Sequence, residues 1–142
     1  MALKVVLDTN VVLDLVVFDE PEAGPLREAI ESGRVTLLTR GDCLDELRRV
    51  LAYPRFALDH AAQVSAFAWM EARATAIVAE APDALLPRCR NADDQKFLDL
   101  AWTAGAHYLV TKDRALLELG RRVARMGRFL VSLPTELPLA SR

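Results

Sequence analysis

The sequence contains few cysteines and histidines. In 142 residues it has two cysteines, Cys43 and Cys89, and two histidines, His60 and His107. The cysteines lie far apart and neither has a partner at metal-ligand spacing. We therefore expect free thiols, as in a reducing cytosol, and regard a pairing between them as the less favoured alternative. The histidines are too few and too scattered for a zinc site, which argues against a zinc enzyme.

A strong net charge and an uninterrupted apolar run are lacking as well. The chain has 18 basic and 20 acidic residues, a net charge of -2, so any nucleic-acid contact must come from local basic groups. The apolar stretch 3–18 is too interrupted for a secretory signal or a membrane span, because it contains Lys4, Asp8, Asn10 and Asp14. We expect a cytoplasmic protein with no membrane association.

The composition is that of an ordinary globular domain, with 52% hydrophobic and 27% charged residues. Segments typical of strands and helices alternate. The strands are expected at 3–7, 35–38, 77–79, 108–111 and 129–131. The helices are expected at 10–18, 26–32, 40–52, 57–75, 93–104 and 115–125, and Thr39 is expected to cap the third of them.

This alternation predicts βαβ crossovers and a mostly parallel sheet with helices on both faces, a three-layer α/β/α fold. The sequence has no internal repeat and no linker-like segment. We therefore expect one domain over residues 1–142, with a tail from about position 135.

Two acids follow strands of the expected sheet. Asp8 ends the first strand and Asp113 follows the fourth. Sites in such sheets form beyond the carboxyl ends of the strands, so the two carboxylates are expected at one rim. Taken singly, each is better explained as a surface acid or a helix cap.

Two further acids lie on expected helices. Glu46 adjoins an apolar stripe, whereas Asp45 shares its face with arginines and should face solvent. Asp94 begins the buried stripe of its helix, and Asp93 fits a capping role better. Periodicity leaves open whether Glu46 turns inward or reaches to water, and whether Asp94 acts as a cap.

Convergence of these acids would have a chemical consequence. Two carboxylates about 5 Å apart repel by roughly 3 kcal/mol at an effective dielectric near 20. A cluster would therefore bind a cation or retain protons. Oxygen ligands suit Mg²⁺ or Mn²⁺.

Four short segments resemble, in order, the acidic motifs of PIN domains: LDTNVV at 7–12, DEL with VL at 45–51, NADDQKFL with a following alanine at 91–101, and VTKD at 110–113. The chain is most similar to family members identified as toxins of bacterial toxin–antitoxin pairs (VapC-like ribonucleases). The resemblance implies a five-stranded parallel sheet ordered 3-2-1-4-5. It also implies RNA cleavage with Mg²⁺ or Mn²⁺, a cognate antitoxin and a homodimer.

By the same resemblance the catalytic, metal-binding acids are Asp8, Glu46, Asp94 and Asp113. Asn10 and Thr111 would support them, and Asp93 could share or take the role of the third acid. The flanking cations are candidates for phosphate contacts: Lys96, Lys112 and Arg114. A second basic group is more simply a solvated helix face: Arg121, Arg122, Arg125 and Arg128. The large aromatic residues at helical spacing are expected in the core: Trp69, Phe97 and Trp102.

Two other classes of protein stay open. A non-catalytic PIN scaffold that binds RNA or protein is the main alternative. A phosphotransfer domain, either a receiver or an aspartate-nucleophile phosphatase, also places an aspartate after its first strand. A phosphatase would have a second aspartate two residues after the first, where this chain has Asn10. A receiver would need an acidic pair at the first strand and a phosphoacceptor on the third, and the sequence has neither.

Overall fold

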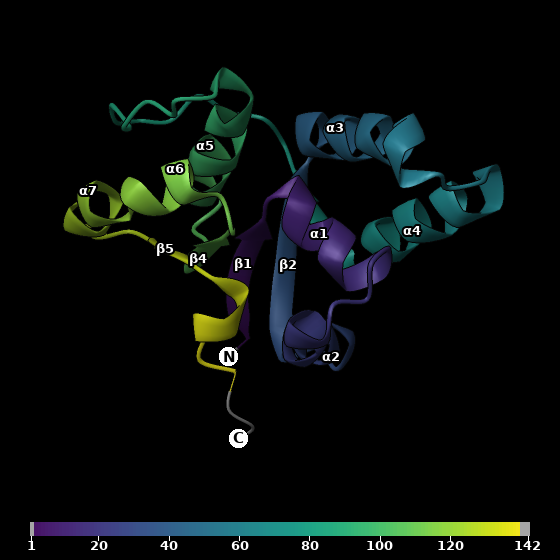
Figure 1. The fold of residues 1–142 in the computed structure, drawn as a ribbon. Helices are drawn as coiled ribbons and strands as arrows, with labels where there is room; N and C mark the ends of the chain where they lie inside the picture. The colour runs from purple at the N-terminus through teal and green to yellow at the C-terminus, as the bar shows by residue number, and fades with distance from the viewer. Residues whose placement is uncertain (1, 140–142) are drawn as a thin grey trace.

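The computed structural model describes residues 2–139 and consists of strands that alternate with helices (Figure 1). The strands are β1 (Leu3–Leu7), β2 (Val35–Arg40), β3 (Ala74–Ile77), β4 (Tyr108–Val110) and β5 (Leu130–Ser132). The helices are α1 (Thr9–Val16), α2 (Gly24–Glu31), α3 (Gly41–Leu51), α4 (His60–Arg73), α5 (Gln95–Thr103), α6 (Arg114–Glu118) and α7 (Gly120–Arg125). Single 3₁₀ turns lie at Pro21–Ala23, Pro54–Phe56, Ala92–Asp94 and Pro134–Glu136.

The five strands form one parallel sheet in the order β3-β2-β1-β4-β5. The predicted fold class and strand order are therefore confirmed. The register sets Leu7 at the end of β1 beside Val110 at the end of β4. The next residues of the two strands, Asp8 and Thr111, consequently lie side by side at the carboxyl rim of the sheet.

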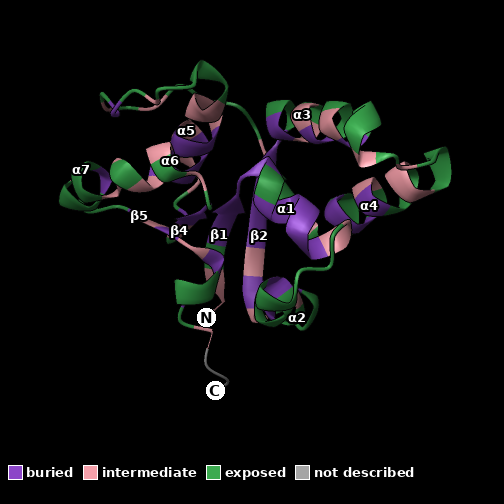
Figure 2. Ribbon diagram, in the orientation of Figure 1, coloured by how far each residue is buried: buried purple, intermediate pink, exposed green. Residues whose placement is uncertain are grey.

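The core has one apolar cluster on each face of the sheet. Val5 and Leu7 of β1 belong to the cluster under α1, α2 and α4, whereas Val6 belongs to the cluster under α5, α6 and α7. This two-sided burial explains why the strand is a continuous apolar run (Figure 2). Burying a leucine such as Leu98, which is 0% exposed, contributes about 1.5–3 kcal/mol. The prediction that the two tryptophans and Phe97 are core residues is confirmed.

Thr39 does not cap α3, so that prediction was wrong. It lies inside β2, paired with Ala76 of β3, and Arg40 takes the capping position. The strand runs beyond its apolar residues because pairing with β3 supplies backbone partners there. The Thr39 hydroxyl is buried without a hydrogen-bond partner among residues 2–139.

Other helix and strand boundaries between residues 57 and 125 also differ from the prediction. The helix expected to begin at Ala57 begins at His60, because Ala57 adopts a left-handed conformation (φ 51°) and Asp59 caps the helix. The helix expected at 115–125 is divided into α6 and α7. The third strand lies at Ala74–Ile77 instead of 77–79.

The C-terminal segment packs against the body of the protein as far as it is described. Leu137 is buried, and the carbonyl of Leu139 accepts a hydrogen bond of 2.8 Å from Arg34 Nη1. The last three positions of the predicted tail, 140–142, lie outside the described residues. Within residues 2–139, every helix is too short or too polar to cross a bilayer.

Candidate functional site

Asp8 is held rigidly at the rim of the sheet. The residue is 5% exposed, and its Oδ1 accepts a hydrogen bond of 3.1 Å from the Val11 amide at the start of α1. Its Oδ2 accepts a hydrogen bond from the Thr111 hydroxyl. Burial raises the pKa of Asp8, while the hydrogen bonds from Thr111 and Val11 oppose that rise.

Thr111 ties Asp8 to Asp113. The Thr111 hydroxyl donates to Asp8 and accepts a hydrogen bond of 2.9 Å from the Asp113 amide. Asp113 Oδ1 in turn accepts a hydrogen bond of 2.9 Å from the Ala115 amide and caps α6. Both aspartates therefore cap a helix, and both lie at the same rim of the sheet. A capping role and a place at this rim are thus compatible for the same residue.

Asp94 brings the third motif to the same place. It lies at the end of the 3₁₀ turn that leads into α5. Desolvation, followed by a hydrogen bond to Asp113 and the charges of Asp113, Asp8 and Glu46, raises the pKa of Asp94 to about 6. Carboxylates from three other segments of the chain therefore lie close enough to Asp94 to disfavour its ionisation.

Glu46 turns inward from α3. Its side chain is 14% exposed, and its Oε1 accepts a hydrogen bond of 2.6 Å from Lys96 Nζ. Its Oε2 accepts a hydrogen bond from the Thr9 hydroxyl. The neighbouring Asp45 is exposed, as predicted from the helical angle.

Asp93 is the exposed member of the Asp93–Asp94 pair. Within residues 2–139, its hydrogen bonds are made by its backbone: its carbonyl accepts from Lys96, and its amide donates to Asn91. Asn91, and not Asp93, is therefore the residue whose side chain caps the turn. Asp94 is the member of the pair that adjoins the other three acids.

The supporting and basic residues occupy different places. Asn10 is exposed and lines a cleft of about 390 Å³ together with Lys112 and Asp113. Lys112 forms an ion pair with Asp14, and Arg114 is exposed. The second basic group on and after α7 is also exposed, in agreement with a solvated face.

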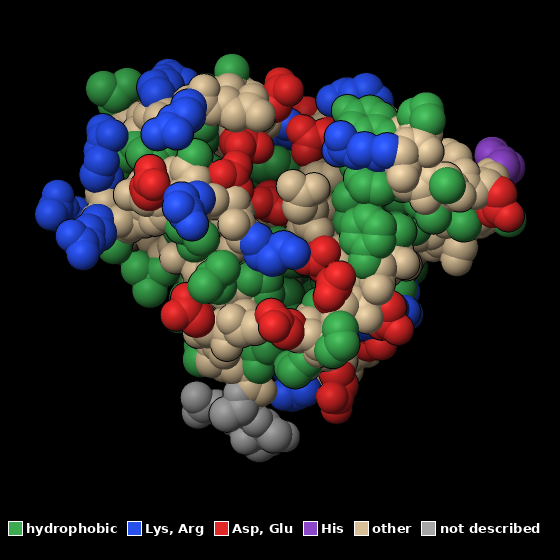
Figure 3. All heavy atoms as spheres, viewed as in Figure 1, with side chains coloured by type: hydrophobic (Ala, Val, Ile, Leu, Met, Phe, Trp, Pro, Cys, Tyr) green, Lys and Arg blue, Asp and Glu red, His purple; other side chains and the backbone are tan. Residues whose placement is uncertain are grey.

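Three features of the site were missed in the sequence: the hydroxyl of Thr9, the inward position of Lys96 and the pairing of Lys112 with Asp14. Thr9 and Lys96 join Glu46 from 37 and 50 residues away, so no local pattern indicates them. Figure 3 shows acidic side chains gathered between the helices of the two sides, with Lys and Arg side chains around them.

The donor set suits a hard divalent cation, because it consists of carboxylate and hydroxyl oxygens. Within residues 2–139, no group of three or more His, Cys, Asp or Glu side chains is arranged so that it could hold a metal ion. The Lys96 ammonium neutralises Glu46 instead. The residues that would supply oxygen ligands to such an ion are Asp8, Glu46, Asp94 and Asp113.

Comparison with known proteins identifies one family. The pattern described as PIN domain matches residues 4–115, a span that contains all four acids and ends within α6. No curated protein matches the chain.

Proposed function

The chain belongs to the PIN domain family, whose members are generally nucleases that use divalent metal ions, and from this we propose that it is a Mg²⁺- or Mn²⁺-dependent endoribonuclease. The observation that carries the proposal is the proximity of the four acids: the Thr111 hydroxyl joins Asp8 to Asp113, and Asp113, Asp8 and Glu46 all act to raise the pKa of Asp94, to about 6. Carboxylates that lie this close are suited to sharing a cation.

In this proposal Asp8 and Asp113 would hold the metal, because the hydrogen bonds from Val11, Thr111 and Ala115 fix both carboxylates. Glu46 and Asp94 would be its further oxygen ligands. When bound, the metal lowers the pKa of a water molecule and stabilises charge on the phosphate oxygens. Thr111 is a positioning residue, since it acts through Asp8 and Asp113.

In this proposal Asp94 also carries a proton. With its pKa near 6 and a hydrogen bond to Asp113, it holds a proton in a fraction of the metal-free molecules at neutral pH. A cation bound at the rim would favour transfer of that proton from the Asp94 carboxyl to solvent water. The exposed cations Arg114 and Lys112 hold the phosphate backbone of RNA, Lys112 by leaving its partner Asp14. Lys96 could join them only by leaving Glu46.

The biological setting follows from the resemblance to toxins alone. On that basis the enzyme is the toxin of a toxin–antitoxin pair, with a cognate antitoxin protein and a homodimeric assembly. A small DNA-binding protein encoded by the neighbouring gene would support this role.

A non-catalytic scaffold is the second candidate, favoured by the ion pair of Lys96 with Glu46 and by the absence of a three-ligand group among the described residues. Titration calorimetry with Mn²⁺ separates the two functions. The nuclease requires binding that Asp8→Asn weakens, whereas a scaffold requires no binding at the acids.

The direct test is cleavage of end-labelled RNA in Mg²⁺ or Mn²⁺. Wild type should cut, Asp8→Asn and Asp113→Asn should not, and Asp45→Asn serves as the matched control because Asp45 is an exposed acid outside the cluster. Cleavage that survives both substitutions, or that persists in excess chelator, would contradict the proposal.

A further inference from the structure

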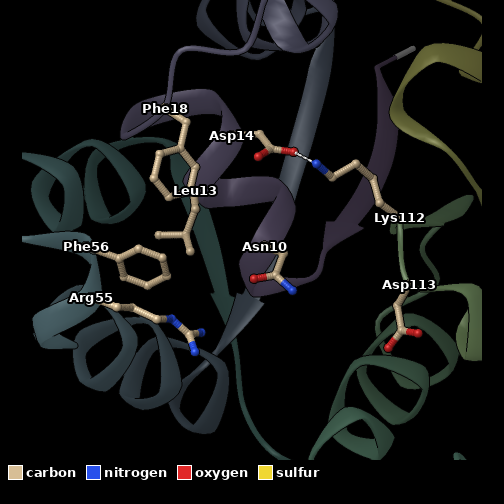
Figure 4. A pocket seen from close by; sticks show the side chains of 8 residues that line it. All are labelled: Asn10, Leu13, Asp14, Phe18, Arg55, Phe56, Lys112 and Asp113. Carbon is tan, nitrogen blue, oxygen red and sulfur yellow. Dashed lines mark ion pairs between the residues drawn. The ribbon is translucent and has the colours of Figure 1, made fainter.

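A cleft with an aromatic wall adjoins the acid cluster. Its volume of about 390 Å³ lies within the range of roughly 300–1,000 Å³ that is usual for small-ligand sites. Leu13, Phe18 and Phe56 form one side, and Lys112 and Asp113 form the other (Figure 4). The cleft therefore joins an apolar surface to one of the proposed metal ligands.

The aromatic wall is partly exposed: Phe56 is half-buried against the core, and Phe18 is exposed. Phe18 is 45% exposed, and its ring meets that of Phe56 edge-on at a centroid distance of 5.5 Å. The Arg55 guanidinium lies 4.9 Å from the centroid of the Phe56 ring. Exposed aromatic rings beside an arginine are typical of binding surfaces, and nucleobases stack on both kinds of group.

The charges of the cleft favour a neutral occupant. Arg55 and Lys112 line it, but so do Asp14 and Asp113, and Asp14 already pairs with Lys112. A phosphate placed deep in the cleft would meet two carboxylates. A flat, uncharged ring would contact the phenylalanines, and the Asn10 amide, which can donate and accept, lies between the two sides (Figure 4).

We propose that this cleft binds a nucleobase of the RNA substrate next to the scissile phosphate, with Phe18 and Phe56 as the stacking surface. The inference rests on the proposed nuclease function. It adds that the substrate is single-stranded at this position, because a paired base is not free to leave its stack.

The test measures binding of fluorescein-labelled RNA oligonucleotides of roughly eight nucleotides. Fluorescence anisotropy is recorded with Ca²⁺ in place of Mg²⁺, so that a hard cation is present. Phe18→Ala and Phe56→Ala should each weaken binding about 5- to 150-fold, the range that base stacking on an aromatic ring provides. Phe18→Ala is the safer variant for folding because Phe18 is exposed.

Phe67→Ala is the matched control. Phe67 is also a partly buried phenylalanine under an arginine, with the Arg48 guanidinium 4.3 Å from the centroid of its ring, but it does not line the cleft. Its substitution should leave RNA affinity unchanged.

A second arm uses the same RNA with one base removed, scanned along the oligonucleotide. At one position the abasic RNA should bind wild type as weakly as intact RNA binds Phe56→Ala, and the two changes together should cost no more than either alone. Additive losses at every position, or normal affinity of both phenylalanine variants, would overturn the base-binding cleft.

The outcomes separate this inference from the proposed function. If wild type neither binds nor cuts RNA, both are wrong. If wild type cuts RNA and the phenylalanine variants bind it normally, only the cleft assignment is wrong. Phenylalanine variants that bind RNA normally but no longer bind a protein partner would also overturn the cleft assignment, since the cleft would then bind a protein.

Discussion

Replacing Asp113 by asparagine is expected to stabilise the metal-free protein while abolishing cleavage. Burial, together with the hydrogen bond and charge of Asp113, raises the pKa of Asp94 from 3.8 to about 6. Asparagine removes the charge but keeps an oxygen that can accept the Ala115 amide, so the cap of α6 is retained. The substitution thus separates electrostatic repulsion from local structure.

The size of the effect follows from the pKa of Asp94. The difference between 3.8 and about 6 corresponds to about 3 kcal/mol in a shielded site. Two corrections reduce this figure. Asp94 is partly exposed, so solvent screens its charge, and burial is a larger cause of its raised pKa than Asp113 is. The substitution should therefore raise the free energy of unfolding by about 1 kcal/mol. A gain of this size raises the urea midpoint by about 0.5 M for an m-value of about 2 kcal/mol/M.

The gain should depend on pH in one direction. Between the two pKa values the folded protein retains a proton on Asp94 that the unfolded chain has lost. The free energy of unfolding of wild type therefore falls as pH rises from about 4 to about 6, and it stays lowered above that. Asp113→Asn reduces this fall, so its advantage should be present at about pH 7.5 and small at about pH 4.

Urea denaturation followed by circular dichroism, in chelator and at both pH values, measures the effect. Asp45→Asn is the control and should change neither midpoint, because Asp45 is exposed and lies apart from the other acids. A midpoint for Asp113→Asn below that of wild type at about pH 7.5 would refute the reasoning, and so would an equal gain at both pH values.

Three further substitutions test other contacts. Thr111→Val removes a buried donor from Asp8 and should lower the free energy of unfolding by about 1–3 kcal/mol; urea denaturation that matches wild type would contradict this. Lys96→Met should weaken the fold by about 2 kcal/mol yet tighten Mn²⁺ binding in calorimetry, because it leaves Glu46 without its ammonium; weaker Mn²⁺ binding would count against the metal site. Leu98→Ala should cost about 2–5 kcal/mol in thermal denaturation, since Leu98 is 0% exposed, and a loss below about 1 kcal/mol would show that the core there is loosely packed.

Features that depend on local pattern could be predicted from the sequence. The apolar run of β1 placed Asp8 at a strand end, and helical angles separated Asp45 from Glu46. The strand order came from the resemblance to PIN domains, because alternation of strands and helices alone does not order a sheet.

Features that depend on distant partners could not be predicted. Threonine is a common helix-capping residue, but pairing with β3 extends β2 through Thr39. Lys96 lies beside acids in sequence and seemed free for phosphate, whereas the packing of α5 near α3 brings it to Glu46. The cleft wall combines Phe18 and Phe56 from separate segments, so neither aromatic residue indicated it alone.

The Thr111 hydroxyl has a consequence for how such an enzyme can change. It joins Asp8 and Asp113 through hydrogen bonds that are part of the fold itself, so the proposed reactive centre has little freedom to adapt to a new substrate. Phe18 follows the end of α1, and its side chain is exposed. Exchange of that side chain can therefore alter the proposed cleft while the strand ends keep their geometry.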